Sequence, residues 1–432
     1  MNGPAVLNTV PAGIDVTVDA PAKARVEIAL QQRKLTFFLR DLAGGGRGLL
    51  EGENVWVQCV PTVEQVSPEQ EGTAIEQRDY PSVFTARDGT VWIAWQGYRN
   101  GGDHLYVRRR RGGTWEQTER LTEQHGDLFR TELGEDAEGR IWVVWSQRYG
   151  QHWDLYARCW EKGRWAGKQK LTSTNHPNIF HRLVASPSGT LHLVWIGHQS
   201  GVSRVYWSRL EGTRWSSPLP ISGPSAWHPE AAVDRSGNLW VTWDSYRSGN
   251  FDIFLRQIEA GKTLGPEIQV TKSPVFQAHP TIAIDPLGRV WLAWDESDAN
   301  WGKDWTRDDQ DRGTVLYKNR RTKVAVFAGG RWMQPAAEVR QAVPARYWRY
   351  IQLPRLSVDG QGRVWLGLQL RTSTAHNRSD YWAFDGWWEF YVTHLAGNRW
   401  SEAVPIPHSK PAAGRPTQAR SAGNRRTTGV GM

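Results

Sequence analysis

Carboxylates and imidazoles recur at matching positions along this sequence. Asp244 and Asp295 each follow a Trp directly, and Glu296 comes next after Asp295. Three segments open on a His-Pro pair, at His176, His228 and His279. Carboxylates and imidazoles are the groups that proteins use most for general acid–base chemistry. The candidates for a catalytic centre are therefore Asp244, Asp295, Glu296 and His279.

Guanidinium groups and aromatic rings accompany these residues. Arginines next to tyrosines recur in segments that we expect to be loops, at Arg99, Arg148 and Arg247. Aromatic faces suit sugar rings, and arginine suits carboxylate or sulfate substituents. The predicted ligand-binding set consists of His176, His228, His279, Arg99, Arg148, Arg247, Tyr246, Trp227, Trp301 and Trp305.

Each of these residues also has a structural interpretation. A His before Pro can bond a neighbouring segment, and loop tryptophans can pack the loops themselves. Adjacent residues on a strand point to opposite faces, which argues against Asp295 and Glu296 working as one acid–base pair. Three histidines could in geometry hold a metal ion, but we predict neither a metal nor a cofactor.

One phrase, Asp-x-x-Gly-x-x-Trp, recurs along the chain and indicates what positions these residues. Its copies, two of them variant, end at Trp92, Trp142, His192, Trp240, Trp291 and Trp365. The steps between these end positions are 50, 50, 48, 51 and 74 residues. A second phrase, with Gly shortly before Trp, follows each copy, at Trp115, Trp165, Trp215, Leu264 (in place of Trp), Trp332 and Trp400. Two markers that keep one period indicate a structural repeat.

Each unit of the repeat is predicted to form four short strands. In the first unit, the strands are expected at 82–86, 91–95, 104–108 and from 115 onward. Four-stranded units of this period are typical of a β-propeller, in which large flat side chains fill the gaps between twisted sheets. The predicted fold is all-β, a propeller of six blades between about residues 76 and 408. The repeated Asp is explained as turn chemistry, since Asp bonds its own backbone in such turns.

The two ends of the chain carry no copy of the marker. Residues 1–75 show alternating strands and are predicted to form a small β-module or to supply a closing strand near 55–57. Residues 409–432 are basic and rich in small polar residues, which predicts disorder. A seventh blade stays open as an alternative, because Gly414-Arg415-Pro416-Thr417 resembles the start of another first strand.

Insertions single out one face of the predicted propeller. The tight marker turns share one face, and the second-to-third and blade-to-blade loops share the other. From the first marker to the second, blades one to three use 23 residues each, whereas blades five and six use 41 and 35. Long loops on a rigid scaffold commonly carry binding sites. The candidate residues belong to this long-loop face, where we predict a funnel.

Charge and composition exclude several classes of protein. The net charge is +9, but five basic residues from Lys410 onward leave only +4 for the first 409 residues, so we predict no nucleic-acid partner. No apolar run approaches the ~18 residues of a spanning helix. No signal peptide is visible, so the sequence does not assign a cellular compartment. If a signal peptide was removed, the protein is extracytoplasmic. Two cysteines, Cys59 and Cys159, cannot build a disulfide framework. We expect the protein to be a monomer.

Two phrases carry a family resemblance. They are Trp243-Asp-Ser-Tyr-Arg-Ser-Gly-Asn-Phe-Asp252 and Trp294-Asp-Glu-Ser-Asp-Ala-Asn-Trp-Gly-Lys-Asp304. The repeats that contain them resemble a sialidase-like or TolB-like propeller module of bacterial proteins, which precedes a metal-dependent hydrolase domain of the PHP type. The resemblance spans the six blades and implies an accessory module. It carries no hydrolase residue onto this chain, which has no His-x-His cluster.

Sialidase-type propellers are similar as well, with two differences. Their Asp-box has one residue between Asp and Gly, whereas two residues separate Asp285 from Gly288. Their box also precedes the fourth strand, whereas the turns here are expected before the second. An arginine triad of the sialidase kind cannot be assigned from the sequence.

The sequence leaves three functional hypotheses. The first is a non-catalytic propeller that binds a carbohydrate, another polar ligand or a protein partner through the long-loop face. The second is a glycan-active enzyme, a glycoside hydrolase or a polysaccharide lyase, with its site in the same funnel. The third is a scaffold without a small ligand.

Overall fold

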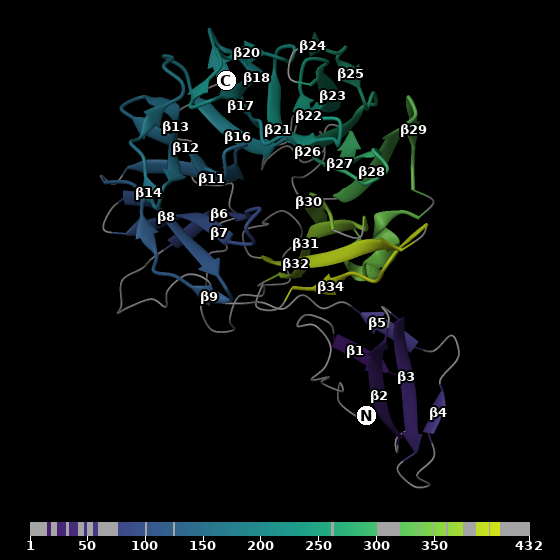
Figure 1. The fold of residues 1–432 in the computed structure, drawn as a ribbon. Helices are drawn as coiled ribbons and strands as arrows, with labels where there is room; N and C mark the ends of the chain where they lie inside the picture. Colours follow the sequence, from purple (N-terminus) through teal and green to yellow (C-terminus); the bar gives the residue numbers. More distant parts are fainter. Residues whose placement is uncertain are drawn as a thin grey trace. The chain divides into compact units, whose positions relative to one another are not determined.

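The computed structural model gives the chain an all-β fold with two short 3₁₀ helices (Figure 1). It describes residues 77–406 except 100–101, 124–125, 261–262, 300–319, 336, 349, 360–361, 375–385 and 397, and the strands at 15–18, 24–31, 34–41, 47–49 and 55–58. Trp301, Trp305 and the tail from 409 lie outside the described residues. One compact unit comprises residues 1–65 and 404–411, and the other comprises 66–403 and 412–432.

The first unit contains two small antiparallel sheets. β1 (Asp15–Val18) pairs with β5 (Val55–Gln58). The other sheet has the order β2-β3-β4, from β2 (Ala24–Gln31), β3 (Lys34–Asp41) and β4 (Arg47–Leu49). The strands expected from alternation in this region are thus present. The segment considered as a closing strand for the propeller, 55–57, pairs with β1 instead.

The second unit confirms the predicted six-bladed propeller. The three long strands of the blades are β6 (Gln77–Thr85), β7 (Val91–Arg99) and β8 (Gly102–Arg111); β11 (Asp127–Glu135), β12 (Ile141–Tyr149) and β13 (His152–Glu161); β16 (Asn178–Ala185), β17 (Leu191–Gln199) and β18 (Val202–Glu211); β21 (Ala226–Val233), β22 (Leu239–Ser245) and β23 (Asp252–Glu259); β26 (Val275–Ile284), β27 (Val290–Ala299) and β28 (Arg321–Ala328); and β30 (Ile351–Val358), β31 (Val364–Thr374) and β32 (Gly386–Ala396).

Short strands complete the blades at the outer edge of the ring. They are β9 (Thr114–Trp115), β10 (Glu119–Arg120), β14 (Arg164–Trp165), β15 (Gln169–Lys170), β19 (Arg214–Trp215), β20 (Leu219–Pro220), β24 (Thr263–Leu264), β25 (Ile268–Gln269), β29 (Arg331–Met333), β33 (Arg399–Trp400) and β34 (Val404–Pro405). The 3₁₀ helices η1 (Val339–Ala342) and η2 (Ala345–Tyr347) separate blades five and six. No helix among the described residues is long and apolar enough to cross a membrane.

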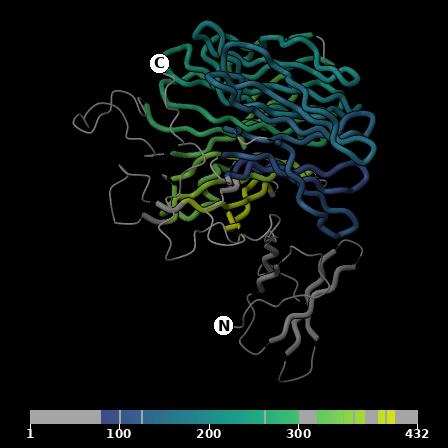
Figure 2. Tube along the Cα trace, turned by 90° about the vertical axis from the view of Figure 1, so that its left-hand side faces the viewer, coloured from purple at the N-terminus to yellow at the C-terminus, as the bar shows by residue number. Residues whose placement is uncertain are grey.

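The first strands of the blades lie around the centre of the ring. Labels β6, β11, β16, β21, β26 and β30 surround that centre in Figure 1. Each of these strands contacts the first strand of the next blade, from β6 through to β30. The side view in Figure 2 shows the blades in chain order, from blue through teal to green and yellow. Side chains on the first strands of different blades therefore come close together in space.

The Asp-x-x-Gly-x-x-Trp turns are held by their own aspartates, as the sequence predicts. In blade five, Asp285 Oδ1 accepts hydrogen bonds from the backbone N–H groups of Leu287 and Arg289, at 2.9 and 3.0 Å. Its Oδ2 accepts a bond from the indole Nε1 of Trp291, at 2.9 Å. The aspartates of blades two, four and six bond the marker Trp in the same way. The third residue after each Asp is Gly with positive φ, as at Gly288 with φ +75°, which glycine adopts at little cost.

A second Trp in each of blades one to five packs the blade from within. This Trp of the second strand stacks on an aromatic residue directly opposite on the third strand in blades one to four. The ring centroids are 5.8 to 6.2 Å apart in the pairs Trp95–Tyr106, Trp145–Tyr156, Trp195–Tyr206 and Trp243–Phe254. Burial of these large flat rings accounts for much of the unusual Trp content.

Candidate functional site

Every first strand of the propeller contains a β-bulge next to a residue in the left-handed backbone region. The bulges interrupt the register between the first and second strands of all six blades. The left-handed residues are Tyr80, Arg130, Phe180, His228, His279 and Leu353, with φ between 44° and 60°. Non-glycine residues rarely adopt this conformation, and bulges often aim a side chain at a functional site. We call these six residues the bulge ring.

The bulge ring occupies one repeat position whose side chain changes from blade to blade. Each of its members lies 12 residues before the end of the Asp-x-x-Gly-x-x-Trp phrase of its blade, for example His279 before Trp291 and Phe180 before His192. The backbone conformation is thus a property of the repeat. The side chains are not, because they comprise two imidazoles, one guanidinium, two other aromatic rings and one aliphatic chain.

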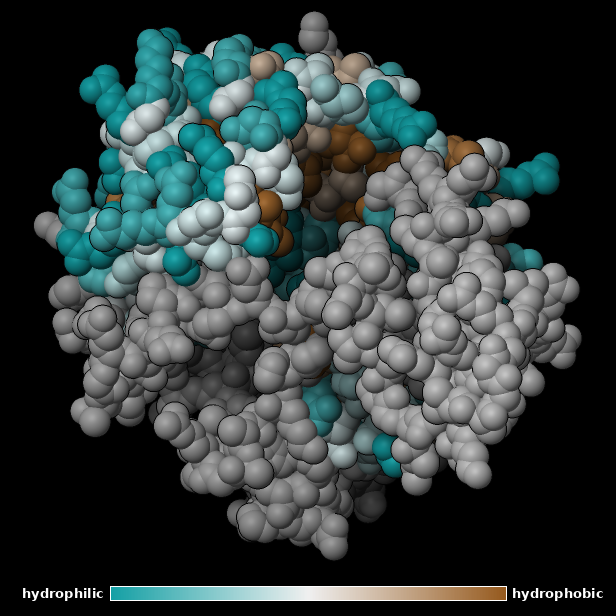
Figure 3. All heavy atoms as spheres, turned by 60° about the horizontal axis from the view of Figure 1, so that its bottom comes forward, coloured by the Kyte–Doolittle hydropathy of each residue, from teal (hydrophilic) through white to brown (hydrophobic). Residues whose placement is uncertain are grey.

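Aromatic rings form a continuous arc through five blades at this level. The centroid of Phe129, next to the ring member Arg130, lies 4.9 Å from that of Tyr80 and 5.1 Å from that of Phe180. The arc continues from Phe180 to His228 at 5.1 Å and from His228 to His279 at 4.6 Å. Figure 3 shows hydrophobic residues gathered in a hollow among hydrophilic ones, in the part of the view drawn in colour.

The two histidines of the bulge ring each bond a buried aspartate. Nδ1 of His228 lies 2.9 Å from Oδ2 of Asp244, and Nδ1 of His279 lies 2.9 Å from Oδ2 of Asp295. Both aspartate side chains are fully buried, whereas the imidazoles are 33% and 23% exposed. A carboxylate only accepts hydrogen bonds, so Nδ1 carries a proton in both rings, and Nε2 of a ring offers a lone pair when that ring is neutral.

The aspartates also connect neighbouring blades. Asp244 Oδ2 accepts a 2.7 Å bond from the backbone N–H of His279, and Asp295 Oδ1 accepts a 2.9 Å bond from the backbone N–H of Leu353. Oδ1 of Asp244 is buried and has no hydrogen-bond partner among the described residues. The His–Asp pairs of blades four and five are therefore coupled through a shared carboxylate.

Burial and charge set the protonation of this cluster. Burial opposes ionisation of Asp244, but the charge and hydrogen bond of His228, together with His279, hold the pKa of Asp244 below its ordinary value. Burial and the neighbouring His228 lower the pKa of His279, although its bond to Asp295 acts in the opposite direction. An ionised aspartate beside a neutral imidazole is the state suited to proton abstraction or to accepting a ligand hydroxyl.

A charged layer lies two residues further along the first strands. Arg182 bonds Glu132 of blade two, and its Nε lies 2.6 Å from Glu230 of blade four. Nη1 of Arg355 lies 3.6 Å from Glu230. Burial opposes ionisation of Glu230, but Arg182 and Arg355 lower its pKa to about 2. These charges neutralise one another and link blades two, three, four and six.

Arg130 differs from the arginines of that layer. Its guanidinium carbon lies 5.8 Å from the ring centroid of Phe129 and 5.6 Å from that of Phe180. Within the described chain it makes no hydrogen bond or ion pair to another side chain. Burial and the charge of Arg182 lower its pKa to about 9, which still leaves a cation at neutral pH. Arg130 is therefore a cation with unused donors beside the arc of rings.

The structure brings four of the sequence candidates together and separates the others. Asp244, Asp295, His228 and His279 form the cluster just described. Glu296 points away from Asp295, as strand alternation predicts, and bonds Gln277 and Arg321. Trp227 is half-buried and packs its ring 4.9 Å from that of His198.

The candidate arginines lie further out on the blades. Arg148 is exposed and has its Nη1 3.4 Å from Asp127. Arg247 pairs with Glu267 and lies 3.8 Å over the ring of Phe254. Tyr246 is exposed and packs near Phe251, at 5.0 Å between ring centroids. Arg99 ends strand β7, and nothing in the described residues places its side chain.

His176 lies outside the bulge ring. It precedes β16, and its carbonyl accepts bonds from Thr174 and Asn178. In blade three, Phe180 takes the position that His228 and His279 take in the next blades. Sequence reasoning grouped His176 with them by the His-Pro pair and missed Arg130, Phe180 and Tyr80. The 12-residue spacing before the marker would have found all of them.

No group of three or more potential ligand side chains in the described residues could hold a metal ion. No family model matches the chain, and no curated protein matches it in sequence. Solved structures do match it. A protein of unknown function from Dyadobacter fermentans has 13% identity and a TM-score of 0.43, over 67% of this chain and 96% of that one.

Two further matches are glycan enzymes. An ulvan lyase of the polysaccharide lyases has 12% identity and a TM-score of 0.49, over 77% of this chain and 85% of that one. An α-L-arabinanase from Penicillium chrysogenum has 14% identity and a TM-score of 0.44, over 68% of this chain and 88% of that one. Similarity at these values does not assign a site residue.

Proposed function

We propose that the bulge ring binds an acidic carbohydrate. The observation that carries the proposal is Arg130, a cation without a protein partner among the described residues, set between two phenylalanine rings at the same level as two imidazoles. A guanidinium in these surroundings suits a carboxylate or sulfate, since it offers several donors in one plane.

The neighbouring rings suit the remainder of a sugar. Tyr80, Phe129 and Phe180 offer aromatic faces or edges to its C–H groups. Nε2 of His228 and of His279 can accept bonds from hydroxyl groups, because Nδ1 is already held by a carboxylate. An arc of rings with a cation near its middle and acceptors at one end matches a sugar that carries one acidic group.

Binding to acidic and neutral polysaccharides tests this proposal. We expect wild-type protein to bind polygalacturonate or alginate more tightly than dextran in affinity electrophoresis and calorimetry. Arg130→Met keeps an unbranched apolar stem and removes the charge, and it should weaken acidic binding about tenfold or more, because a bond to a charged group contributes about 1.5–3 kcal/mol. Arg148→Met, an exposed arginine already paired with Asp127, is the matched control.

Two results would contradict the proposal. One is equal affinity for acidic and neutral polysaccharides. The other is unchanged acidic binding in Arg130→Met at the thermal stability of the wild type. A stable protein partner that competes for the same residues, with no glycan binding, would favour the protein-partner alternative.

A second candidate function is catalysis on the same ligand, and the paired His–Asp contacts favour it. An imidazole held by a buried carboxylate with its Nε2 exposed is an arrangement that general bases use. A glycoside hydrolase would release reducing ends, and a lyase would release an unsaturated sugar that absorbs ultraviolet light. His279→Asn should abolish such turnover and retain binding, whereas a binding module shows no product with any variant.

The accessory role implied by the resemblance to propellers that precede PHP-type hydrolase domains stays a prediction. It fits a binding function for this chain. It would be supported by a glycan preference that matches the substrate of the partner domain.

A further inference from the structure

Blade five breaks the internal packing pattern of the four blades before it. In blades one to four, the second-strand Trp lies opposite an aromatic residue, such as Phe254 opposite Trp243. In blade five, the residue opposite Trp294 is Lys323. One face of Trp294 therefore has no stacking ring from the third strand.

The outer edge of blade five differs as well. In blades one to four, a second short strand pairs with the third strand and covers it, as β25 does on β23. In the described part of blade five, the sheet has only the order β26-β27-β28-β29. After β29 the chain continues to η1 instead. The described part of blade five thus lacks both the stacking ring and the covering strand of the earlier blades.

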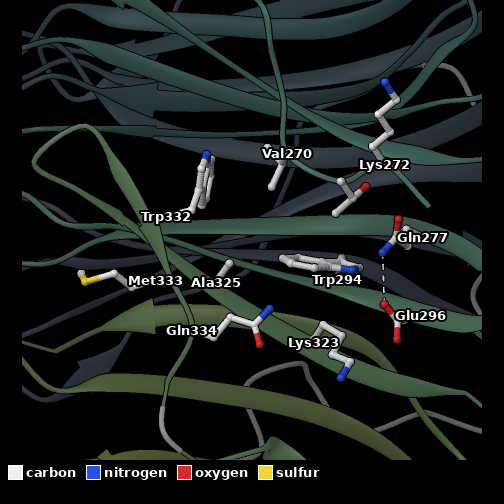
Figure 4. A pocket seen from close by; sticks show the side chains of 11 residues that line it. Val270, Lys272, Gln277, Trp294, Glu296, Lys323, Ala325, Trp332, Met333 and Gln334 are labelled. Carbon is white, nitrogen blue, oxygen red and sulfur yellow. Dashed lines mark hydrogen bonds between the residues drawn. The ribbon is translucent and has the colours of Figure 1, made fainter.

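A pocket of about 430 Å³ lies at this place, between the end of blade four and blade five (Figure 4). Its lining includes Trp294, Trp332, Lys272, Lys323 and Gln334. In Figure 4, Trp294 lies between Lys272 and Lys323, with Trp332 toward the other end. The comparable groove between blades two and three contains Trp215 at the place of Trp332, but its lining includes no second-strand Trp.

The charges at the pocket leave it cationic. Glu296 is neutralised by Arg321, whose Nε lies 2.8 Å from it, and Gln277 donates to its other oxygen. Nζ of Lys323 lies 3.7 Å from the exposed carboxylate of Glu338, so these two side chains form an ion pair at the surface. Lys272 is exposed and makes no hydrogen bond or ion pair within the described residues. Lys272 is therefore available to a ligand, and Lys323 can exchange its exposed partner for a ligand carboxylate.

Aromatic and amide groups complete the pocket. Trp332 is half-buried and forms one wall, and Nε1 of Trp294 is buried without an acceptor. Among the described residues, Trp95 and Trp243 also lack an acceptor, whereas Trp145 and Trp195 donate to Gln147 and Asn178. In blade five, Trp294 lines the pocket. A ring with C–H groups, hydroxyls and one negative charge fits this lining.

We infer that blade five carries a second ligand site, independent of the bulge ring, for a sugar carboxylate such as a uronic acid residue. The two lysines would pair with the carboxylate, Trp332 would stack on the sugar ring, and Gln334 would bond its hydroxyls. The residue type at position 323 decides whether the site exists, because the aromatic residue of the other blades would fill the space.

Restoring that aromatic residue tests the inference. Galacturonic acid and its short oligomers serve as probes, with calorimetry and saturation-transfer NMR as readouts. Lys323→Tyr should reduce affinity at this site about tenfold or more by closing the pocket, and its thermal midpoint should equal or exceed that of the wild type. Lys272→Gln, at an exposed position that cannot disturb folding, should reduce affinity about threefold.

The two sites are distinguished by repeating these measurements in the Arg130→Met background, where the contribution of the bulge ring is removed and the binding that remains at blade five should be unchanged. Wild-type affinity in both Lys323→Tyr and Lys272→Gln would overturn the inference, as would equal binding of neutral galactose. Binding of a sugar sulfate with no binding of galacturonate would overturn the carboxylate assignment. Loss of all acidic binding in Arg130→Met would show that no second site exists.

Discussion

The Asp-x-x-Gly turns and the bulge ring repeat in opposite ways. At the turns the side chain recurs, and Asp285 makes the same bonds in blade five that Asp136 makes in blade two. At the bulge ring the backbone recurs, while the side chain changes from Arg130 to Phe180 to His228. A recurring side chain here serves the fold. A recurring conformation with changing side chains brings a different group from each blade to one place, which is what the proposed ligand site requires.

The largest effect is expected at the turns. Asp285→Ala removes the acceptor of two backbone N–H groups and of the Trp291 indole, and leaves the indole N–H buried. We expect a loss of about 3 kcal/mol in the free energy of unfolding, measured by urea titration with Trp fluorescence at pH 7.

Arg130→Met, which removes no hydrogen bond, should cost less than about 1 kcal/mol in the same measurement. Equal losses in the two variants would remove the distinction between turns and bulge ring. A large loss in Arg130→Met alone would reverse it.

The pH dependence of stability should show two windows. Burial lowers the pKa of His192 to about 4, so the unfolded chain takes up a proton near 6.5 and the folded chain only near 4. Stability is therefore full above pH 6.5 and falls as the pH is lowered toward 4, by about 2 kcal/mol at pH 5. His192→Gln should flatten this part of the profile of urea midpoints, and an unchanged slope would contradict the assignment.

The turn carboxylates act in a lower window. Burial opposes ionisation of Asp285, but its bonds to Trp291 and Arg289 hold its pKa below 3.8. Its contribution is present above pH 3.8 and is lost as the pH falls through the lower value of the folded state. The cost of Asp285→Ala should therefore shrink only below pH 3.8, whereas His192→Gln alters the profile above it.

The smallest effect concerns the backbone of the bulge ring. Arg130 has φ 60°, a conformation that costs an L-residue with a Cβ roughly 1–2 kcal/mol relative to glycine. Arg130→Gly should therefore be more stable than Arg130→Ala by about 1 kcal/mol in paired urea titrations, although glycine usually weakens a strand. Greater stability of the alanine variant would show that the ring conformation is imposed without strain.

The fold was predictable because its markers are side chains. Asp, Gly and Trp at fixed spacing predict six blades and the face of the propeller that carries the insertions. In blade four, Leu264 replaces the marker Trp and still forms β24 at the expected place. The second Trp of blades one to five was equally visible. Lys323, which stands opposite it in blade five, was not, since the register across a hairpin is needed to see it.

The candidate site was only partly predictable, because its members share a backbone conformation and differ in residue type. His228 and His279 were found since they share both a residue type and a following Pro. Arg130 and Phe180 share neither, so only the distance to the marker aligns them. His176 was grouped with the histidines by its Pro but lies 16 residues before His192 rather than 12. A shared residue type thus aligns positions of this repeat less reliably than the number of residues to the Asp-x-x-Gly-x-x-Trp phrase.

Asp244 and Asp295 also link neighbouring blades. Each accepts a bond from a histidine of its own blade and from the backbone of the following blade. A change at either aspartate would therefore alter the packing among blades four, five and six. It would also alter the chemistry of the imidazoles. Arg130 and Phe180 make no such side-chain hydrogen bond between blades in the described part of the chain, so we expect that they can be exchanged without loss of the ring.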